Sequence, residues 1–224
     1  MTVPAEFGQI PLQRLTEGMC KRKRGILGEH LSIKTAVLVP LLFNARGELA
    51  ILFEQRAATL HRQPSEISFP GGHCEPGDRC EKDTAIRETK EELGIASQDI
   101  HLLGPLDMVV ARSSLFVYPF AGYLPNGMAT LAPNPAEVDT VFTLSISTLL
   151  TATPEVYLME VQSVPPENFP FELIPGGRNY PWRPGSYEEV FYRLEGHVVW
   201  GLTARILRHF LQVWQQYVPF PDKR

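Results

Sequence analysis

Apolar and β-branched residues gather in short runs along the chain, and the first two runs flank a turn sequence. These runs cover Ile33 to Phe43 and Leu49 to Phe53. Between them lies Asn44-Ala45-Arg46-Gly47, in which asparagine and glycine tolerate the backbone angles of a tight turn. The pattern therefore predicts two strands joined as a hairpin.

Further apolar runs predict more strands in the rest of the chain. They cover Ile100 to Val110, Leu115 to Tyr123, Val138 to Phe142, Val156 to Val164 and Tyr187 to Leu194. Arg112-Ser113-Ser114 joins the first two of these runs, and Ser145 to Leu150 is expected as a short helix. Prolines cluster between Pro154 and Pro184, which predicts extended or irregular chain there and no long helix.

Two longer stretches have helical spacing. A closing helix is expected from Val198 to Tyr217, because its apolar residues recur every fourth position at Leu202, Ile206, Phe210 and Trp214. The other helix lies between Asp78 and Gly94. Asp78 and Glu81 resemble a capping box at its start, and Gly94 stands where a glycine commonly ends a helix. Its mostly apolar stripe consists of Ala85, Ile86, Thr89 and Leu93.

Strands mixed with two principal helices predict an α/β fold in which a mixed β-sheet lies between helical layers. With 224 residues and 44% hydrophobic content, the chain can bury one sizeable core. We therefore expect a single domain over residues 1–224, with its core at about residues 30–215 and residues 1–29 peripheral.

The second helix also carries three glutamates on one face. An α-helix turns about 100° per residue, so Glu88, Glu91 and Glu92 stand at i, i+3 and i+4. Like charges at this spacing repel each other, and a hard divalent cation with a preference for oxygen ligands would cancel that repulsion. A solvated acidic face is the plainer interpretation. The upstream pair Gly71-Gly72 favours the interpretation as a cation site, because glycines let the backbone approach a metal or a phosphate closely.

The arrangement resembles the Nudix box, Gly-x5-Glu-x7-Arg-Glu-hydrophobic-x-Glu-Glu-x-Gly-hydrophobic. The residues that match by type are Gly72, Arg87, Glu88, Glu91, Glu92, Gly94 and Ile95. This chain has one residue more between Gly72 and Arg87 than the general box, Asp78 or a near neighbour in place of the first Glu, and Thr89 where an aliphatic residue is usual.

A longer loop of this kind is similar to that of the coenzyme A pyrophosphatase branch of the family. The branch motif before the box matches Ile51 to Leu60 and Pro64 to Gly72, with Ser65 in place of the usual Gly. The stretch from His197 to Leu207 resembles the closing helix of the same branch. The resemblance spans roughly residues 30 to 215.

The resemblance implies a Nudix-like α/β/α sandwich that hydrolyses a phosphoanhydride with Mg²⁺ or Mn²⁺. The implied metal ligands are Glu88, Glu91 and Glu92, with the Gly71 carbonyl as an additional one. The base that activates water is one of these glutamates or the loop acid Glu137, for which a solvated role is equally open. Arg87 is expected to support the helix, and Arg56 and Gly72 to bind substrate. We expect the carboxylate face to be wet.

Three functions are open at this point. The first is cleavage of the pyrophosphate of coenzyme A or its thioesters, giving 3′,5′-ADP and a 4′-phosphopantetheine. The second is the same chemistry on ADP-ribose, NADH or a nucleoside triphosphate. The third is a nucleotide-sensing module without catalysis, but such modules usually lose box carboxylates, and this chain keeps all three.

Composition argues against nucleic acid and membrane as partners, and the resemblance implies a small-molecule nucleotide as substrate. The net charge of -4 gives no basic footprint for nucleic acid, and no apolar run approaches the length of a membrane span. The N-terminus lacks the pattern of a signal peptide, so a cytoplasmic location is expected, and a homodimer is left open. Cys20, Cys74 and Cys80 match no zinc spacing and are expected to be free thiols.

Several other residues have a functional and a plainer interpretation. His61 is a candidate second base or a surface residue. The basic run Lys21 to Arg24 could meet the 3′-phosphate of coenzyme A or be merely solvated. Tyr180, Trp182 and Tyr187 could stack on an adenine, although aromatic residues in proline-rich segments more often pack that segment.

Overall fold

The computed structural model describes residues 5–111 and 115–218, and the chain divides into two compact units, residues 1–32 and 33–224. In the first unit, helix α1 covers Ala5–Lys21 and a 3₁₀ turn, η1, covers Glu29–Leu31. The sequence analysis did not predict α1. The spacing of Leu12, Leu15 and Met19 indicates one helical face, but all three side chains are exposed.

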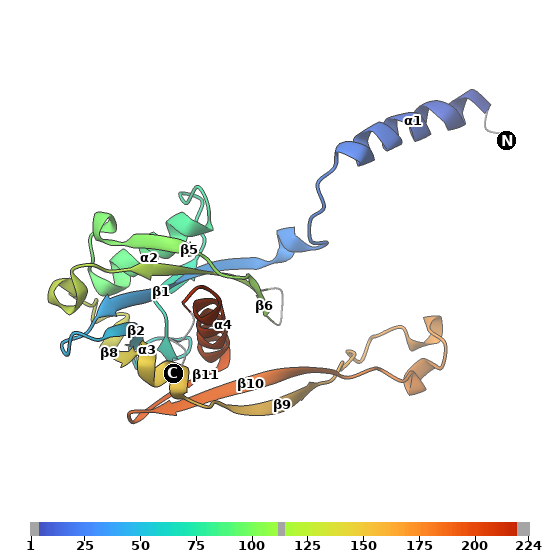
Figure 1. Cartoon of the computed structure of the whole chain (residues 1–224). Helices are drawn as coiled ribbons and strands as arrows, with labels where there is room; N and C mark the ends of the chain where they lie inside the picture. Colours follow the sequence, from blue (N-terminus) through green and yellow to red (C-terminus); the bar gives the residue numbers. More distant parts are fainter. Residues whose placement is uncertain (1–4, 112–114, 219–224) are drawn as a thin grey trace, which may run out of the picture. The chain divides into compact units, whose positions relative to one another are not determined.

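The second unit is built on one large mixed sheet (Figure 1). Its central strand β1 pairs in parallel with β7 over nine residues and antiparallel with β2 and β4. The main path runs β3-β2-β1-β7-β5, and β8 and β6 extend it from β2 and β7. The strands are β1 (Ile33–Phe43), β2 (Leu49–Arg56), β3 (Ile67–Ser68), β4 (Gly71–His73), β5 (His101–Pro105), β6 (Val109–Ala111), β7 (Leu115–Tyr123) and β8 (Val138–Ser145).

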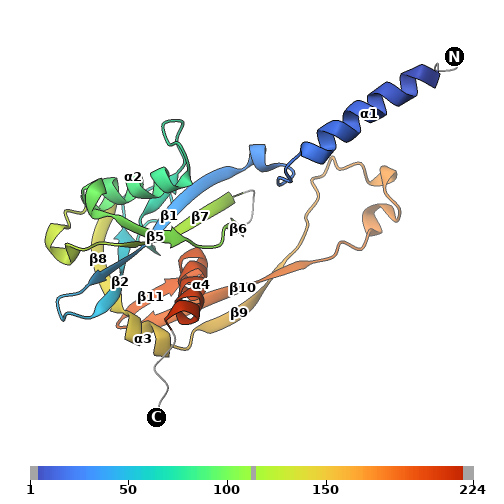
Figure 2. The ribbon, with the colours of Figure 1, turned by 45° about the horizontal axis from the view of Figure 1, so that its top comes forward.

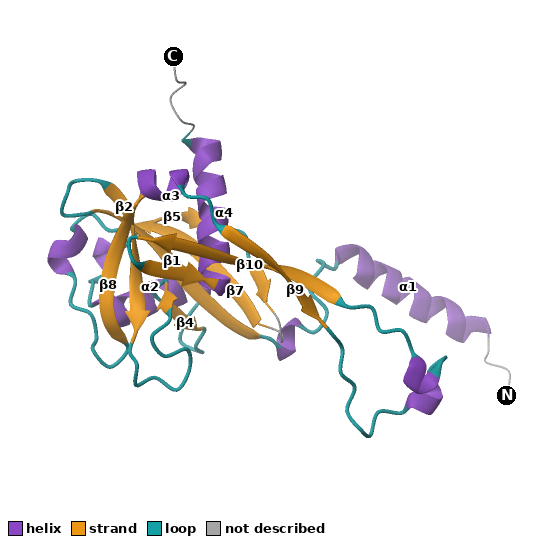
Figure 3. Ribbon diagram, turned by 90° about the horizontal axis from the view of Figure 1, so that it is seen from below, coloured by secondary structure: helices purple, strands orange, loops and turns teal. Residues whose placement is uncertain are grey.

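Three helices and a smaller sheet complete this unit. In Figures 1 and 2, helix α4 lies between the main sheet and the small sheet, and Figure 3 shows β9 and β10 running out to two 3₁₀ turns. The helices are α2 (Glu81–Leu93), α3 (Ile146–Thr151) and α4 (Gly201–Tyr217), and the small sheet is β9 (Glu155–Val161), β10 (Gly185–Leu194) and β11 (His197–Trp200). The 3₁₀ turns are η2 (Ser97–Asp99), η4 (Gly127–Thr130), η5 (Phe171–Leu173) and η6 (Gly177–Asn179).

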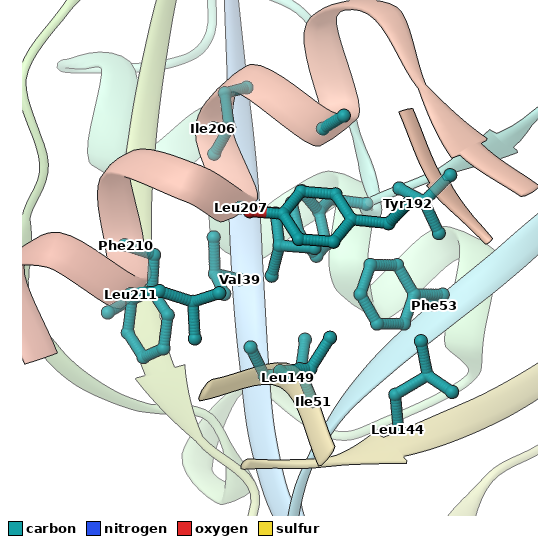
Figure 4. Packing of buried hydrophobic residues seen from close by; sticks show 14 of the residues in the cluster. Val39, Ile51, Phe53, Leu144, Leu149, Tyr192, Ile206, Leu207, Phe210 and Leu211 are labelled. Carbon is teal, nitrogen blue, oxygen red and sulfur yellow. The ribbon is translucent and has the colours of Figure 1, made fainter. Parts of the chain in front are cut away.

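Alternation along the central strands divides the core into two clusters. Val39 of β1 and Phe53 of β2 pack with α4 and the small sheet, in the cluster that Figure 4 shows. Leu38 and Leu52, one residue away on each strand, pack on the opposite face with Leu93 of α2. Because successive side chains of a strand point to opposite faces, each strand serves both clusters.

Most predicted elements are confirmed, including the mixed sheet, the hairpin turn at 44–47, the short helix after Ser145 and the absence of long helices from the described proline-rich segment. Two predictions need correction. The run from Ile100 to Val110 forms two short strands, and the closing helix begins at Gly201 because residues 197–200 pair with β10 as β11. The predicted connection 112–114 lies outside the described residues. Within the described ranges, none of the helices combines the length and apolarity that crossing a membrane requires.

Candidate functional site

The start of α2 differs from the predicted capping box. The residue before the helix is Cys80, and it makes no side-chain capping bond. Asp78 lies two residues further upstream and accepts hydrogen bonds from Thr84 Oγ1 at 2.8 Å and from the Glu75 backbone at 3.0 Å. The prediction was wrong because the loop continues beyond Asp78, whose carboxylate is engaged with Arg87 instead.

Arg87 ties the loop between β4 and α2 to the helix. Its Nε and Nη2 donate to the two carboxylate oxygens of Asp78 at 3.1 and 3.0 Å, and Nη2 also donates to the His73 carbonyl at 3.0 Å. Hydrogen bonding to Arg87 is the largest cause that holds the pKa of Asp78 below its usual range. Nη1 donates to Glu88 at 2.9 Å and to Glu91 at 3.2 Å. These contacts join the loop to the helix, and the supporting role of Arg87 stays a prediction.

The three box glutamates have different environments. Glu92 is 4% exposed and accepts a hydrogen bond from the Gly71 backbone N–H at 2.8 Å. Glu88 packs against Gly72, where any Cβ would collide with its carboxylate. Glu91 has a side chain that is 50% exposed. The expectation of a wet carboxylate face is therefore wrong for Glu92, which the β4 backbone covers, and holds only for Glu91.

The sequence analysis missed Glu54, which is fully buried in β2. Burial raises its pKa, and the charges of Glu137 and Glu88 add to the effect, against a hydrogen bond from Ser68 Oγ and the charge of Arg56. Burial also raises the pKa of Glu92, with the charge of Glu54 as the next cause. A glutamate inside the apolar run from Ile51 was the signal that could have revealed it, because lone charges are rarely buried there without a partner.

Glu137 lies in a loop distant in sequence, and its charge acts on Glu54 and Glu88. Its carbonyl accepts from the Ala57 backbone N–H at 2.8 Å, and its carboxylate accepts from Asn134 Nδ2 at 3.1 Å. The Asn134 backbone N–H in turn donates to the Glu92 carbonyl at 2.9 Å. At the end of α2, Gly94 has a φ of 68°, and a Cβ there would meet the Ala132 carbonyl, so glycine lets this loop approach the helix.

We call Glu54, Glu88, Glu92 and Glu137 the carboxylate cluster, since their charges influence one another. Arg56 borders it, with Nη1 3.7 Å from Glu92 Oε1.

The segment after Arg56 turns back at Ser65, which has a φ of 61° and stands where the similar branch motif has glycine. The Ser65 backbone N–H donates to the Arg56 carbonyl at 3.2 Å, so the loop closes with serine in a conformation that favours glycine.

The other candidate residues lie apart from this cluster or on the surface. His61 is exposed in the loop after β2. Tyr180 and Trp182 pack edge to face, with ring centroids 4.9 Å apart, while Tyr187 lines a separate hollow of about 550 Å³ over the small sheet. The exposed run from Lys21 to Arg24 belongs to the first unit. Cys20, Cys74 and Cys80 are free thiols, as predicted.

The donor chemistry of the cluster fits a divalent cation. Carboxylates are the oxygen ligands that hard cations prefer, and one buried oxygen of Glu54 has no hydrogen-bond partner among the described residues. In the described part of the chain, however, no three Asp, Glu, His or Cys side chains already converge as a metal site. Arg87 contacts both Glu88 and Glu91, so these two carboxylates are engaged by a guanidinium in this arrangement.

The raised pKa values predict how the metal-free protein responds to pH. A carboxyl whose pKa is higher in the folded state than its ordinary 4.5 binds more protons when folded, so it stabilises most at low pH. The contribution of Glu54 and Glu92 should therefore decline as pH rises above about 4.5 toward their raised pKa values. Melting temperatures in EDTA from pH 5 to 9 should fall more steeply for the wild type than for Glu92→Gln. Parallel curves would contradict the assignment.

Comparisons with known proteins show which proteins this chain is similar to. The family model described as NUDIX domain matches residues 33–180. The human protein named mitochondrial coenzyme A diphosphatase NUDT8 is 36% identical over 208 residues, which cover 92% of this chain and 78% of that protein. A protein of Photorhabdus laumondii named uncharacterized Nudix hydrolase NudL is 31% identical over 177 residues, which cover 79% of this chain and 82% of that protein.

The solved structures that are similar to this chain include a MutT/nudix family protein from Enterococcus faecalis. Its TM-score is 0.47 at 16% identity, and the match covers 95% of this chain and 70% of that one. The NUDIX match from residue 33 to residue 180 includes the whole carboxylate cluster.

Proposed function

The chain belongs to the Nudix family and is a Nudix pyrophosphohydrolase, and from this premise we propose that it cleaves the pyrophosphate of coenzyme A or its thioesters. The products would be 3′,5′-ADP and a 4′-phosphopantetheine. The observation that carries the substrate is the 36% identity with the human coenzyme A diphosphatase over 92% of this chain. The resemblance of residues 51–60 and 64–72 to the motif of the coenzyme A pyrophosphatase branch supports it, and Arg56 in that stretch borders the carboxylate cluster.

In the proposed mechanism, Glu88, Glu91 and Glu92 would hold the Mg²⁺ or Mn²⁺ that Nudix hydrolases generally need, and the Gly71 carbonyl would be an additional ligand. When bound, the cation would supply charge neutralisation at the phosphate oxygens and activation of water. Gly72 leaves room for Glu88 against the backbone. Arg87 fixes the loop and the helix relative to each other through Asp78 and the His73 carbonyl.

Two carboxylates are candidates for the base that takes the proton from the attacking water. Glu88 is partly buried, and burial raises its pKa. Glu137 is held in place through Asn134 and its own carbonyl, which are contacts that orient a loop acid. Comparing the pH dependence of kcat for Glu88→Gln and Glu137→Gln would separate them, because loss of the base removes the acidic limb of the profile.

A substrate panel tests the proposed function. The protein would be incubated with Mg²⁺ and either coenzyme A, an acyl thioester, ADP-ribose, NADH or dGTP, and the products identified by mass. We expect the highest kcat/KM for coenzyme A or the thioester. Faster cleavage of ADP-ribose or NADH would overturn the substrate and leave the family membership intact. Binding without cleavage would indicate a sensing module.

Arg56→Ala should lower kcat/KM for coenzyme A. A guanidinium beside the carboxylate cluster is suited to a substrate phosphate, and a lost hydrogen bond to a charged group costs about 1.5–3 kcal/mol, or roughly 10- to 150-fold. The matched control is Arg46→Ala, whose guanidinium pairs with Glu48 at the exposed hairpin turn. Equal kcat/KM for the wild type and Arg56→Ala would contradict substrate binding by Arg56.

A further inference from the structure

Glu54 has a position that the box motif does not account for. It follows Leu52 by two residues on β2, so its side chain points to the same face as Leu52, which packs with Leu93 of α2. Helix α2, which carries Glu92, covers this face of the sheet. No part of the Glu54 side chain reaches solvent, since the residue is 0% exposed.

The carboxylate of Glu54 is only half satisfied. Its Oε1 accepts a hydrogen bond from Ser68 Oγ at 3.1 Å, and its buried Oε2 has no hydrogen-bond partner among the described residues. Buried polar atoms are nearly always paired, and an unpaired buried charge is far more costly than an unpaired neutral group. Each such atom in a folded protein therefore calls for a ligand or for another explanation.

Neither neighbouring arginine provides a hydrogen-bond partner for Glu54 Oε2. Arg56 is the nearest, but its Nη1 is directed to Glu92, and its buried Nε also lacks a partner in the part of the chain that the structure describes. Arg87 is bound to Asp78, Glu88 and Glu91. Among the described residues, Arg56 is thus the one guanidinium beside both Glu54 and Glu92, and a residue with only a packing role would be more stable here without a charge.

We propose that Glu54 is an additional carboxylate ligand of the divalent cation, with Oε2 as the oxygen that faces it. The inference rests on the proposed function and deepens it, because it extends the ligand set from the box helix to strand β2. Ser68 acts as the positioning residue by holding Oε1, which fixes the orientation of the carboxylate plane.

Measuring the affinity for metal tests the role of Glu54 without depending on catalytic activity. Calorimetric titration with Mn²⁺ should show a Kd at least about tenfold higher for Glu54→Gln than for the wild type, the scale on which ligand-sphere changes act. The matched control is Glu160→Gln, an exposed strand glutamate of β9 that should leave the Kd unchanged. Ser68→Ala should raise the Kd by a smaller factor. An unchanged Kd for Glu54→Gln would overturn the proposal.

Thermal stability and the position of the bound ion provide two further tests. Without metal, Glu54→Gln should melt no lower than the wild type, because it removes an unpaired buried charge; a lower melting temperature with an unchanged Kd would assign Glu54 a purely structural role. Should that variant not fold, anomalous diffraction from wild-type crystals soaked in Mn²⁺ should place the ion in contact with Glu54, and a Mn²⁺ ion remote from Glu54 would refute the proposal. Neither result would affect hydrolysis of coenzyme A by the wild type. Failure of the Glu54 assignment can therefore be distinguished from failure of the proposed function.

Discussion

Replacing Glu92 by glutamine is expected to lower kcat for coenzyme A at least about a hundredfold while the protein remains folded. The side chain is 4% exposed, accepts from the Gly71 N–H, lies beside Arg56 and is influenced by the charge of Glu54, so a metal-bound carboxylate here would act where water cannot screen it. Glutamine keeps the size of the side chain and can still accept from the Gly71 N–H. Glutamine is also neutral, like the protonated glutamate that burial favours in the metal-free protein, so the melting temperature near neutral pH should not fall.

The control for this experiment separates catalysis from stability. Glu91→Gln should also lower kcat strongly if Glu91 binds the metal, although its half-exposed side chain contributes little to the core. Glu160→Gln, on the exposed strand β9, should match the wild type in both measurements. Full activity in both Glu91→Gln and Glu92→Gln would refute the metal assignment. A large drop in melting temperature for Glu92→Gln would point to a structural role.

Arg87→Met should lower the free energy of unfolding by about 2–4 kcal/mol and reduce activity as a consequence. The guanidinium serves Asp78, the His73 carbonyl and two helix glutamates, and Asp78 has a side chain only 8% exposed. Removing one member of such a pair leaves the other charge buried and unpaired, which is the costly way to break it. Urea unfolding monitored by circular dichroism would measure the loss.

Arg79→Met is the matched comparison for Arg87→Met. Arg79 also pairs with an aspartate, Asp83, but the guanidinium is 87% exposed and water screens the pair. The denaturation midpoint of this variant should equal that of the wild type. If Arg87→Met behaved in the same way, the loop between β4 and α2 would have to be held by other contacts.

Periodicity in the sequence was sufficient for the parts of the fold in which burial follows a regular pattern. The runs from Ile33 and from Leu49 became β1 and β2, and the stripe that includes Ala85 and Leu93 is buried as predicted. The N-terminus of α2 was predicted wrongly because Asp78 has two available partners, a helix end and Arg87. Sequence spacing does not show which partner lies closer in space.

The environment of the site was harder to predict than its residues. The helical spacing of Glu88, Glu91 and Glu92 indicated a shared face, but the burial of Glu92 depends on the β4 backbone, which covers it through Gly71. Glu54 is 34 positions away from Glu88 along the chain, and only the pairing of β2 with its neighbours brings it to the same face. Such contacts depend on tertiary structure, so no local pattern reports them.

The loop that carries Glu137 is held by backbone hydrogen bonds and by the Asn134 side chain, and this determines which of its positions can accept proline. The N–H groups of Ala132 and Asn134 donate to the carbonyls of Leu93 and Glu92, and the Ala136 N–H donates to the Asn134 side chain. The intervening positions, Pro133 and Pro135, have no N–H to donate. Proline is thus tolerated at alternate positions and excluded from the others. The course of the loop past the helix, and with it the position of the Glu137 carboxylate, therefore depends on these backbone donors and on the Asn134 side chain.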